Sequence, residues 1–129
     1  MVDTPLPGAV QAFLLRQIDS IAHLEALLLL RAHADTPWSA DALAQRLYIT
    51  VQDTAAILAR LEADGFLVAL SRQPPLYQYH CAAAAQADLV DEVAACYAKY
   101  LIPVTHLIHN KPRPQVQAFA EAFKLRKEE

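Results

Sequence analysis

The chain has 129 residues, of which 55% are hydrophobic and 19% are charged, with a formal net charge of -3. This length and composition exclude a disordered chain, and only 2 glycines among many alanines and leucines favour helices. Two cysteines, Cys81 and Cys96, are too few for a disulfide framework, and no secretion leader follows Met1. No apolar run approaches the roughly 20 residues that span a bilayer. We therefore expect a mostly helical, cytoplasmic protein that does not cross a membrane.

Charge is divided unevenly along the chain. Residues 1–98 hold five arginines against eleven carboxylates, a net of -6, whereas residues 99–129 hold six cations against three carboxylates, a net of +3. Such asymmetry predicts a basic tail that meets an acidic surface, either of this chain or of a partner.

The first half of the chain contains signals for four helices. Residues 1–8 hold two prolines and predict an arm, and apolar residues at helical spacing predict a short helix over residues 9–18. Asp19 or Ser20 can cap a second helix, which ends before Pro37. Ser39 and Thr50 are N-cap residues for a third helix, which runs to about residue 47, and for a fourth, which Gly65 ends. The third and fourth are separated by a turn at residues 48 and 49.

The pattern changes from helix to strand after this glycine. Residues 66–70 and 76–80 predict a hairpin around a polar tip with two prolines. Helix resumes from about Ala82, is kinked or broken by Pro103, and is followed by a last helix after Pro114.

The spacing of apolar residues predicts one core shared by the second, third and fourth helices and the hairpin. The expected members are Leu24, Leu27, Leu28, Leu43, Leu47, Ile57, Leu58, Leu61, Phe66 and Val68.

This order of elements resembles the winged helix-turn-helix domain of bacterial transcription regulators. Residues 39–47 resemble the second helix of such a domain, residues 48–50 its turn, residues 54–61 its recognition helix, and residues 61–68 the exit into its wing. The long helices that follow resemble the dimerising ends of MarR and PadR types, without fixing a subfamily. We therefore divide the chain into three parts. These are an N-terminal arm with a short helix over residues 1–19, a winged helix over residues 20–81, and C-terminal helices with a basic tail over residues 82–129.

The resemblance implies that the helix after Thr50 lies in the major groove of DNA and that the hairpin contacts the neighbouring backbone. The implied DNA contacts are Thr50, Gln52, Arg60, Arg72 and Gln73. Residues 36–80 nevertheless carry three arginines against four carboxylates, whereas phosphate contacts usually supply much of the affinity for DNA.

The sequence leaves two alternatives to DNA binding open. Ala55, Ala56 and Ala59 form a small apolar strip on the outer face of the recognition helix, which fits a module that binds another regulatory protein. A third hypothesis is a sensor with a pocket between the helix that holds residues 24–30 and the helix that holds residues 89–101.

A homodimer is expected because the C-terminal half holds more apolar residues than a small core can bury. The predicted interface residues are Leu89, Val93, Tyr97, Tyr100, Leu107, Phe119 and Phe123.

Catalysis and metal binding find little support in the residues. Ser20, Ser39 and Ser71 are explained as caps or a turn, and no glycine-rich phosphate loop is present. His106 and His109 lie one helical turn apart, but together with His80 and the cysteines they lack a recognised zinc spacing. We expect a protein that is not an enzyme and uses no cofactor or metal.

Overall fold

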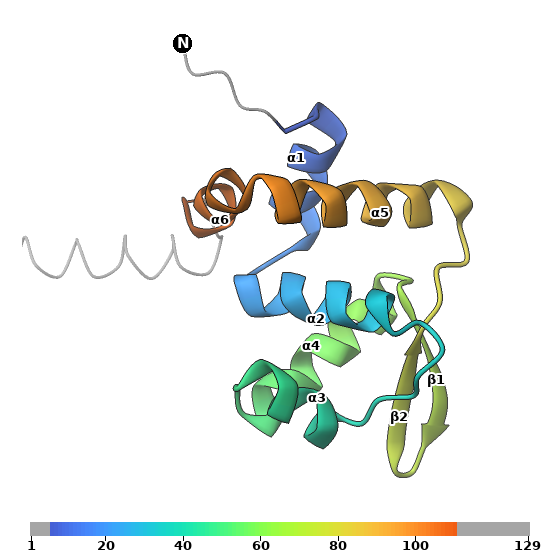
Figure 1. Cartoon of the computed structure of the whole chain (residues 1–129). Helices are drawn as coiled ribbons and strands as arrows, with labels where there is room; N and C mark the ends of the chain where they lie inside the picture. Colours follow the sequence, from blue (N-terminus) through green and yellow to red (C-terminus); the bar gives the residue numbers. More distant parts are fainter. Residues whose placement is uncertain (1–5, 111–129) are drawn as a thin grey trace, which may run out of the picture.

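A computed structural model of the chain describes residues 6–110, which form six helices and one two-stranded sheet (Figure 1). The elements in chain order are α1 (Gly8–Gln17), α2 (Ile21–Ala32), α3 (Ala40–Leu47), α4 (Val51–Ala63), β1 (Leu67–Arg72), β2 (Pro75–Tyr79), α5 (Ala84–Lys99) and α6 (Leu101–Asn110).

Three helices begin at the hydroxyl caps that the sequence predicts. The side-chain oxygens of Ser20, Ser39 and Thr50 accept hydrogen bonds from backbone N–H groups three residues later, at 3.0, 3.1 and 3.0 Å. Each bond satisfies one of the N–H groups that a helix start leaves without an intrahelical partner. The starts of α2, α3 and α4 are therefore set locally.

The turn between α3 and α4 depends on an unusual backbone conformation. Tyr48 follows α3 with φ 59° and ψ 41°, in the left-handed region, and its N–H donates to the carbonyl of Ala44 at 2.8 Å. A residue with a Cβ adopts this conformation at a cost of roughly 1–2 kcal/mol. The short turn predicted at this place is confirmed.

Gly65 follows the end of α4. Like Tyr48 it has a positive φ, here +90°. The N–H of Phe66 then donates to the carbonyl of Leu61 at 3.0 Å, which closes the last turn of α4. The predicted left-handed glycine is confirmed, and it directs the chain into the hairpin.

The hairpin pairs β1 with β2 in antiparallel register, with Leu67 opposite Tyr79 and Ala69 opposite Tyr77. Its strands are shifted slightly from the predicted ranges. Trp38 forms an isolated antiparallel bridge to β2, because it exchanges backbone hydrogen bonds with Tyr77 at 2.7 and 2.8 Å. The sequence did not predict this bridge, which fixes the hairpin beside the start of α3.

Pro103 separates the last two described helices, as predicted. α5 ends at Lys99, and α6 begins at Leu101 with the proline in its first turn, where a missing N–H costs no intrahelical bond. α6 then packs against α1, α2 and α5, so α1, α5 and α6 form a layer above α2 (Figure 1).

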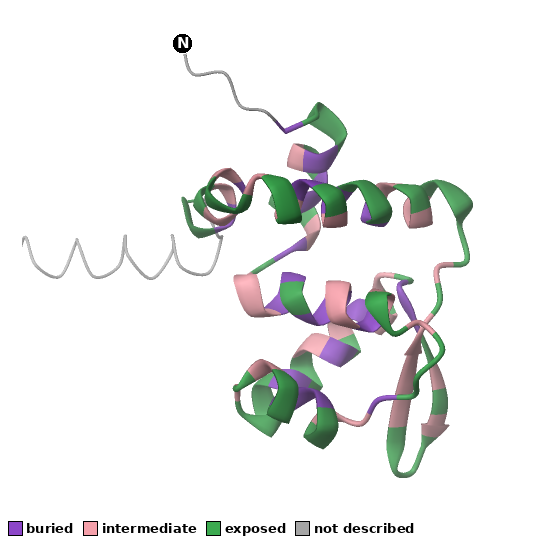
Figure 2. Ribbon diagram, viewed as in Figure 1, coloured by how far each residue is buried: buried purple, intermediate pink, exposed green. Residues whose placement is uncertain are grey.

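The core runs between this layer and the helix-turn-helix elements, and buried positions follow the inward faces of both (Figure 2). Phe13 of α1 meets Phe66 edge to face, with ring centroids 5.7 Å apart. Of the predicted core residues, Leu28, Leu47 and Ile57 are partly buried against the core. The expectation for Val68 is wrong, because its side chain is 40% exposed. The fully buried members are Leu24, Leu27, Leu43, Leu58, Leu61 and Phe66.

Candidate nucleic-acid interface

The outward face of α4, the helix that follows the turn, is exposed. Thr54, Leu58 and Leu61 are buried, at the three-to-four residue spacing of one helical face. The opposite face is exposed from the first turn of α4 to Ala59. It consists of Val51, Gln52, Asp53, Ala55, Ala56 and Ala59. In a winged helix this is the surface of the recognition helix.

Thr50 and Gln52 lie at the N-terminal end of α4, and both are exposed. The hydroxyl of Thr50 accepts the capping bond, while its carbonyl accepts a bond from the Thr54 hydroxyl at 2.8 Å. Two hydrogen bonds therefore hold Thr50 at the start of α4. Gln52 follows it on the helix and carries both a donor and an acceptor, the combination that reads adenine edges.

Arg60 is bound to two carboxylates of the same chain. Its Nη1 lies 2.8 Å from Asp19 Oδ2, and its Nε lies 2.9 Å from Asp64 Oδ2. Burial acts to lower the pKa of the Arg60 guanidinium, but its bonds and charge interactions with Asp64 and Asp19 outweigh this and raise the pKa. The predicted phosphate contact is thus engaged by its own protein.

Arg72 is engaged in the same way at the end of β1. Its two terminal nitrogens lie 2.6 and 3.1 Å from the two carboxylate oxygens of Glu62 in α4. The hydrogen bonds and charge of Glu62 raise the pKa of the Arg72 guanidinium. Gln73 follows at the exposed tip, where its N–H donates to Ser71 Oγ at 3.3 Å. The structure therefore brings the hairpin arginine onto α4 and leaves Gln73 in solvent.

Sequence reasoning missed an exposed tyrosine beside this face, next to Val51 at the start of α4. Tyr48 is 93% exposed in the turn, and Val51 is 47% exposed in the first turn of α4. Together with the alanines they extend the apolar strip toward α3. The signal was a tyrosine inside a helix-turn-helix turn, where a large side chain has no core to enter.

A groove lies between α2, α3 and α5, where the sensor hypothesis placed a pocket. Its volume is about 350 Å³, and within it the Tyr97 hydroxyl donates to Glu25 Oε2 at 2.9 Å. Burial and this bond raise the pKa of Tyr97 to about 12. We call it the α2–α3–α5 groove. Its lining residues are Glu25, Leu28, Leu29, Ala32, Arg46, Leu47 and Tyr97.

The residues predicted for dimerisation differ in how far they are buried within the chain. Val93 is fully buried within the chain, and four others pack partly buried against the core: Leu89, Tyr97, Tyr100 and Leu107. Phe119 and Phe123 lie outside the described residues. The apolar side chains left exposed on the helical layer are instead Leu15 of α1 and Leu101 and Ile102 of α6.

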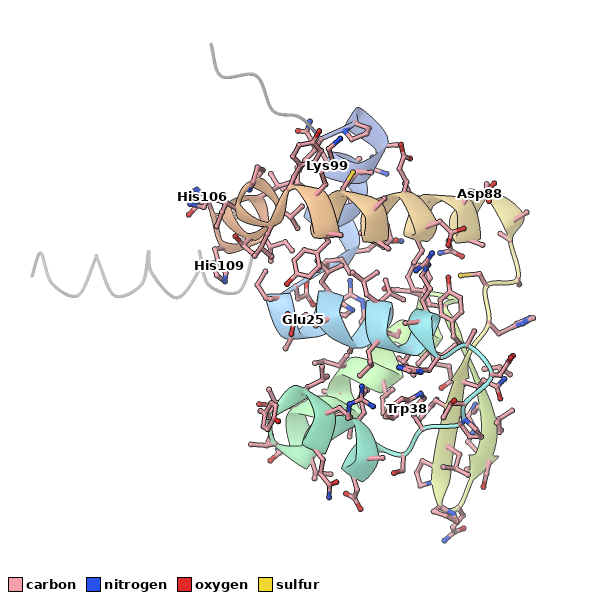
Figure 3. The ribbon with its side chains drawn as sticks, in the orientation of Figure 1. Glu25, Trp38, Asp88, Lys99, His106 and His109 are labelled. Carbon is pink, nitrogen blue, oxygen red and sulfur yellow. The ribbon has the colours of Figure 1, made fainter. Side chains whose placement is uncertain are left out.

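Two further expectations concern metal binding and the crossing of a membrane. His106 and His109 are both exposed on α6 (Figure 3), and residues 6–110 contain no cluster of three or more potential metal ligands. In the same part of the chain, every helix is too short or too polar to cross a bilayer.

The comparison with known proteins rests on structure. No protein-family model and no curated protein matches the sequence. Three solved structures resemble the chain over nearly its whole length. The RV1404 protein of Mycobacterium tuberculosis aligns with 94% of this chain and 84% of its own, at 20% identity and a TM-score of 0.51.

One of the other two is a repressor by name, and the other is bound to DNA. The multiple antibiotic-resistance repressor MarR of Listeria monocytogenes covers 94% of this chain and 82% of its own, at 18% identity and a TM-score of 0.51. A variant of MepR from S. aureus, bound to an oligodeoxyribonucleotide, covers 92% and 86%, at 16% identity and a TM-score of 0.52. The chain therefore has the winged-helix fold of MarR-type proteins, with helices before and after the winged helix.

Proposed function

We propose that the chain is a transcriptional regulator without catalytic activity that binds duplex DNA through α4 and the β1–β2 hairpin. The observation that carries this proposal is the free face of α4, which stands exposed in the position of the recognition helix. The MepR variant with the same fold is bound to an oligodeoxyribonucleotide. Such a regulator acts in the cytoplasm.

The residues of the interface divide into two roles. Gln52, with Thr50 beside it, reads base edges in the major groove, because both lie exposed at the N-terminal end of α4. Arg60, Arg72 and Gln73 contact the phosphate backbone. The arginines do so by exchanging Asp19, Asp64 and Glu62 for phosphate oxygens, which have similar geometry for a guanidinium.

The electrostatics limit the strength of this binding. Residues 6–110 hold six cations against ten carboxylates, a net of -4. Each arginine contact to phosphate must also break an ion pair within the protein. We therefore expect weak binding to random DNA, with affinity that depends on few phosphate contacts and on the basic residues after position 110.

The regulator is a homodimer, and the described residues favour α1 and α6 for its interface. Leu15, Leu101 and Ile102 are 42%, 49% and 63% exposed on the helical layer. Exposed apolar side chains that gather on neighbouring helices mark interaction surfaces. With the winged helix over residues 20–81 kept free, a dimer of this kind presents two recognition helices.

Selection of duplexes from a random-sequence library tests the DNA proposal. The full chain is expected to enrich an inverted repeat with half-sites about one helical turn apart, as a two-fold dimer requires. A Gln52→Ala variant should enrich the same spacing with weaker base preference. Recovery of no sequence above the starting library, by chain shown to be folded, contradicts the proposal.

A second candidate function is favoured by the ion pairs. Because Arg60 and Arg72 are bound to carboxylates, the face around α4 offers apolar Tyr48 and Val51, the alanines and the carboxylate of Asp53. Such a surface fits a basic, partly apolar segment of another regulatory protein. An Ala56→Arg substitution separates the two functions: added positive charge strengthens DNA binding, whereas it repels a basic protein partner and blocks close approach.

A further inference from the structure

The turn between α3 and α4 carries a large side chain that the fold does not use. Tyr48 is 93% exposed, so its ring and hydroxyl stand in water. The turn itself is held by the backbone: the N–H groups of Tyr48 and Ile49 donate to the carbonyl of Ala44 at 2.8 and 3.3 Å. Any residue in this conformation can make these bonds, so the side chain of Tyr48 is not needed for them.

The backbone conformation of Tyr48 is unfavourable for a residue of its size. Its φ of 59° lies in the left-handed region, which glycine enters without steric cost and bulky residues rarely adopt. Among residues 6–110 the other residue with a positive φ is Gly65, for which the conformation is unstrained. A strained, exposed residue that adds nothing to the packing is typical of a functional site. We therefore looked for a contact of Tyr48 outside the chain.

Tyr48 lies beside the part of α4 that the proposed function places in the major groove. It comes just before Thr50 and Gln52, and α3 packs against α4 at the end of the molecule away from α5 (Figure 1). In a helix-turn-helix the first helix crosses the DNA backbone while the second lies in the groove. The turn that joins them therefore meets the edge of the groove, where a side chain reaches phosphates and sugars rather than base edges.

The chemistry of tyrosine suits such a contact in this chain. Its hydroxyl donates hydrogen bonds, as phosphate oxygens require, and its ring can cover the apolar side of a sugar. Arg60 and Arg72 must leave Asp19, Asp64 and Glu62 before they bind phosphate. The neutral Tyr48 breaks no ion pair when it does so.

We propose that Tyr48 is a contact to the DNA backbone, with its hydroxyl donating to a phosphate oxygen at the edge of the groove that α4 enters. The ring lies on the adjoining sugar. The contact fixes the position of Thr50 and Gln52 along the groove and reads no base itself. This inference rests on the proposed function, and it assigns the exposed tyrosine to DNA rather than to a protein partner.

Two variants of the full chain separate the hydroxyl from the backbone strain. Tyr48→Phe keeps the ring, whereas Tyr48→Gly removes the side chain and relieves the left-handed conformation. Tyr48→Phe should lower the affinity for selected and random duplexes alike by about tenfold, the loss for one hydrogen bond to a charged acceptor, and Tyr48→Gly by at least as much. The slope of log affinity against log salt should not change, because no charge is removed.

The stability of the variants excludes a trivial cause for the loss. Tyr48→Gly is expected to unfold at the same urea concentration as the original chain or at a higher one, so its weaker binding would not reflect unfolding. Tyr100→Phe is the matched control. Tyr100 lies between α5 and α6, is partly buried, and should leave the affinity unchanged on substitution.

The outcomes distinguish this inference from the proposed function. Equal affinities of the original chain and both Tyr48 variants would leave the tyrosine to a protein partner and overturn the inference, while DNA binding stands. A loss confined to the selected duplex would make Tyr48 a base-reading residue and overturn the backbone contact. Absence of binding by the folded original chain would contradict the proposed function and, with it, the inference.

Discussion

Arg72 at the end of β1 and Glu62 of α4 face each other through two parallel hydrogen bonds, of 2.6 and 3.1 Å. The pair connects the hairpin to α4, the helix that we propose to enter the DNA groove. The arginine side chain is 71% exposed, so the pair adds little stability to the fold. The pair bears on the proposed DNA binding, because a guanidinium held by a carboxylate is not available to a phosphate.

Replacing Glu62 with Gln is therefore expected to strengthen DNA binding. The released Arg72 gains a phosphate contact, and the loss of one negative charge reduces repulsion. The slope of log affinity against log salt should become steeper by about 0.9, the value for one added contact. Affinity titrations at several salt concentrations measure it. Asp88→Asn removes an exposed carboxylate from α5 and is the control; an equal gain from both variants would show a general charge effect.

Thr50 serves two roles that a matched pair of variants can separate. Thr50→Ala and Ser39→Ala each remove one N-cap hydroxyl, and each should lower the free energy of unfolding by about 1 kcal/mol. Only Thr50 lies at the proposed base-reading end of α4. Urea unfolding is expected to give similar losses, while DNA affinity should fall beyond the stability effect for Thr50→Ala alone. Equal affinities in the two variants would remove Thr50 from the interface.

The proposed dimer interface is tested by placing a charge on α6. Ile102→Asp should convert the dimer to a monomer, because Ile102 is the most exposed of the apolar residues on the helical layer. Leu70→Asp changes an exposed apolar residue on the hairpin and should leave the dimer intact. Light scattering distinguishes the two results. A dimer that survives Ile102→Asp would move the interface away from α6.

The Tyr97–Glu25 bond predicts a specific alkaline effect. Burial and this bond raise the pKa of Tyr97 in the folded chain from 10.0 to about 12. Its stabilisation is therefore fully present below pH 10 and is lost as the pH rises through 12. Tyr97→Phe should be less stable than the original chain at neutral pH, and the difference should shrink over that interval. Urea unfolding at each pH measures the difference, and a constant difference would show that Tyr97 does not ionise in this way.

Local chemistry in the sequence predicted much of the fold. Ser20, Ser39 and Thr50 cap their helices within three residues, and Gly65 acts through its own backbone. Val68 was assigned wrongly because residues 66–70 are apolar throughout, so no alternation shows which face is inward. The pleat of β1 buries Leu67 and leaves Val68 exposed.

Interactions between distant residues could not be predicted in this way. Trp38 pairs with Tyr77, and Arg60 with Asp19, across about forty residues. Val93 was counted among interface residues because its apolar stripe exceeded the expected core, but α1 packs against α5 and helps to enclose it. The exposed residues of α4 were correctly placed as a face, while the ion pairs that alter its charge were not visible in the sequence.

The salt dependence of DNA binding tests the central claim most directly. Fluorescently labelled duplexes of selected and random sequence are titrated with the full chain, Arg72→Ala and Gln52→Ala at several salt concentrations. Binding should be measurable at low salt, with a shallow slope of a few contacts at about 0.9 each. Arg72→Ala should weaken binding to both duplexes and reduce the slope, whereas Gln52→Ala should reduce only the preference for the selected duplex. No binding by folded chain to either duplex at low salt would contradict the claim.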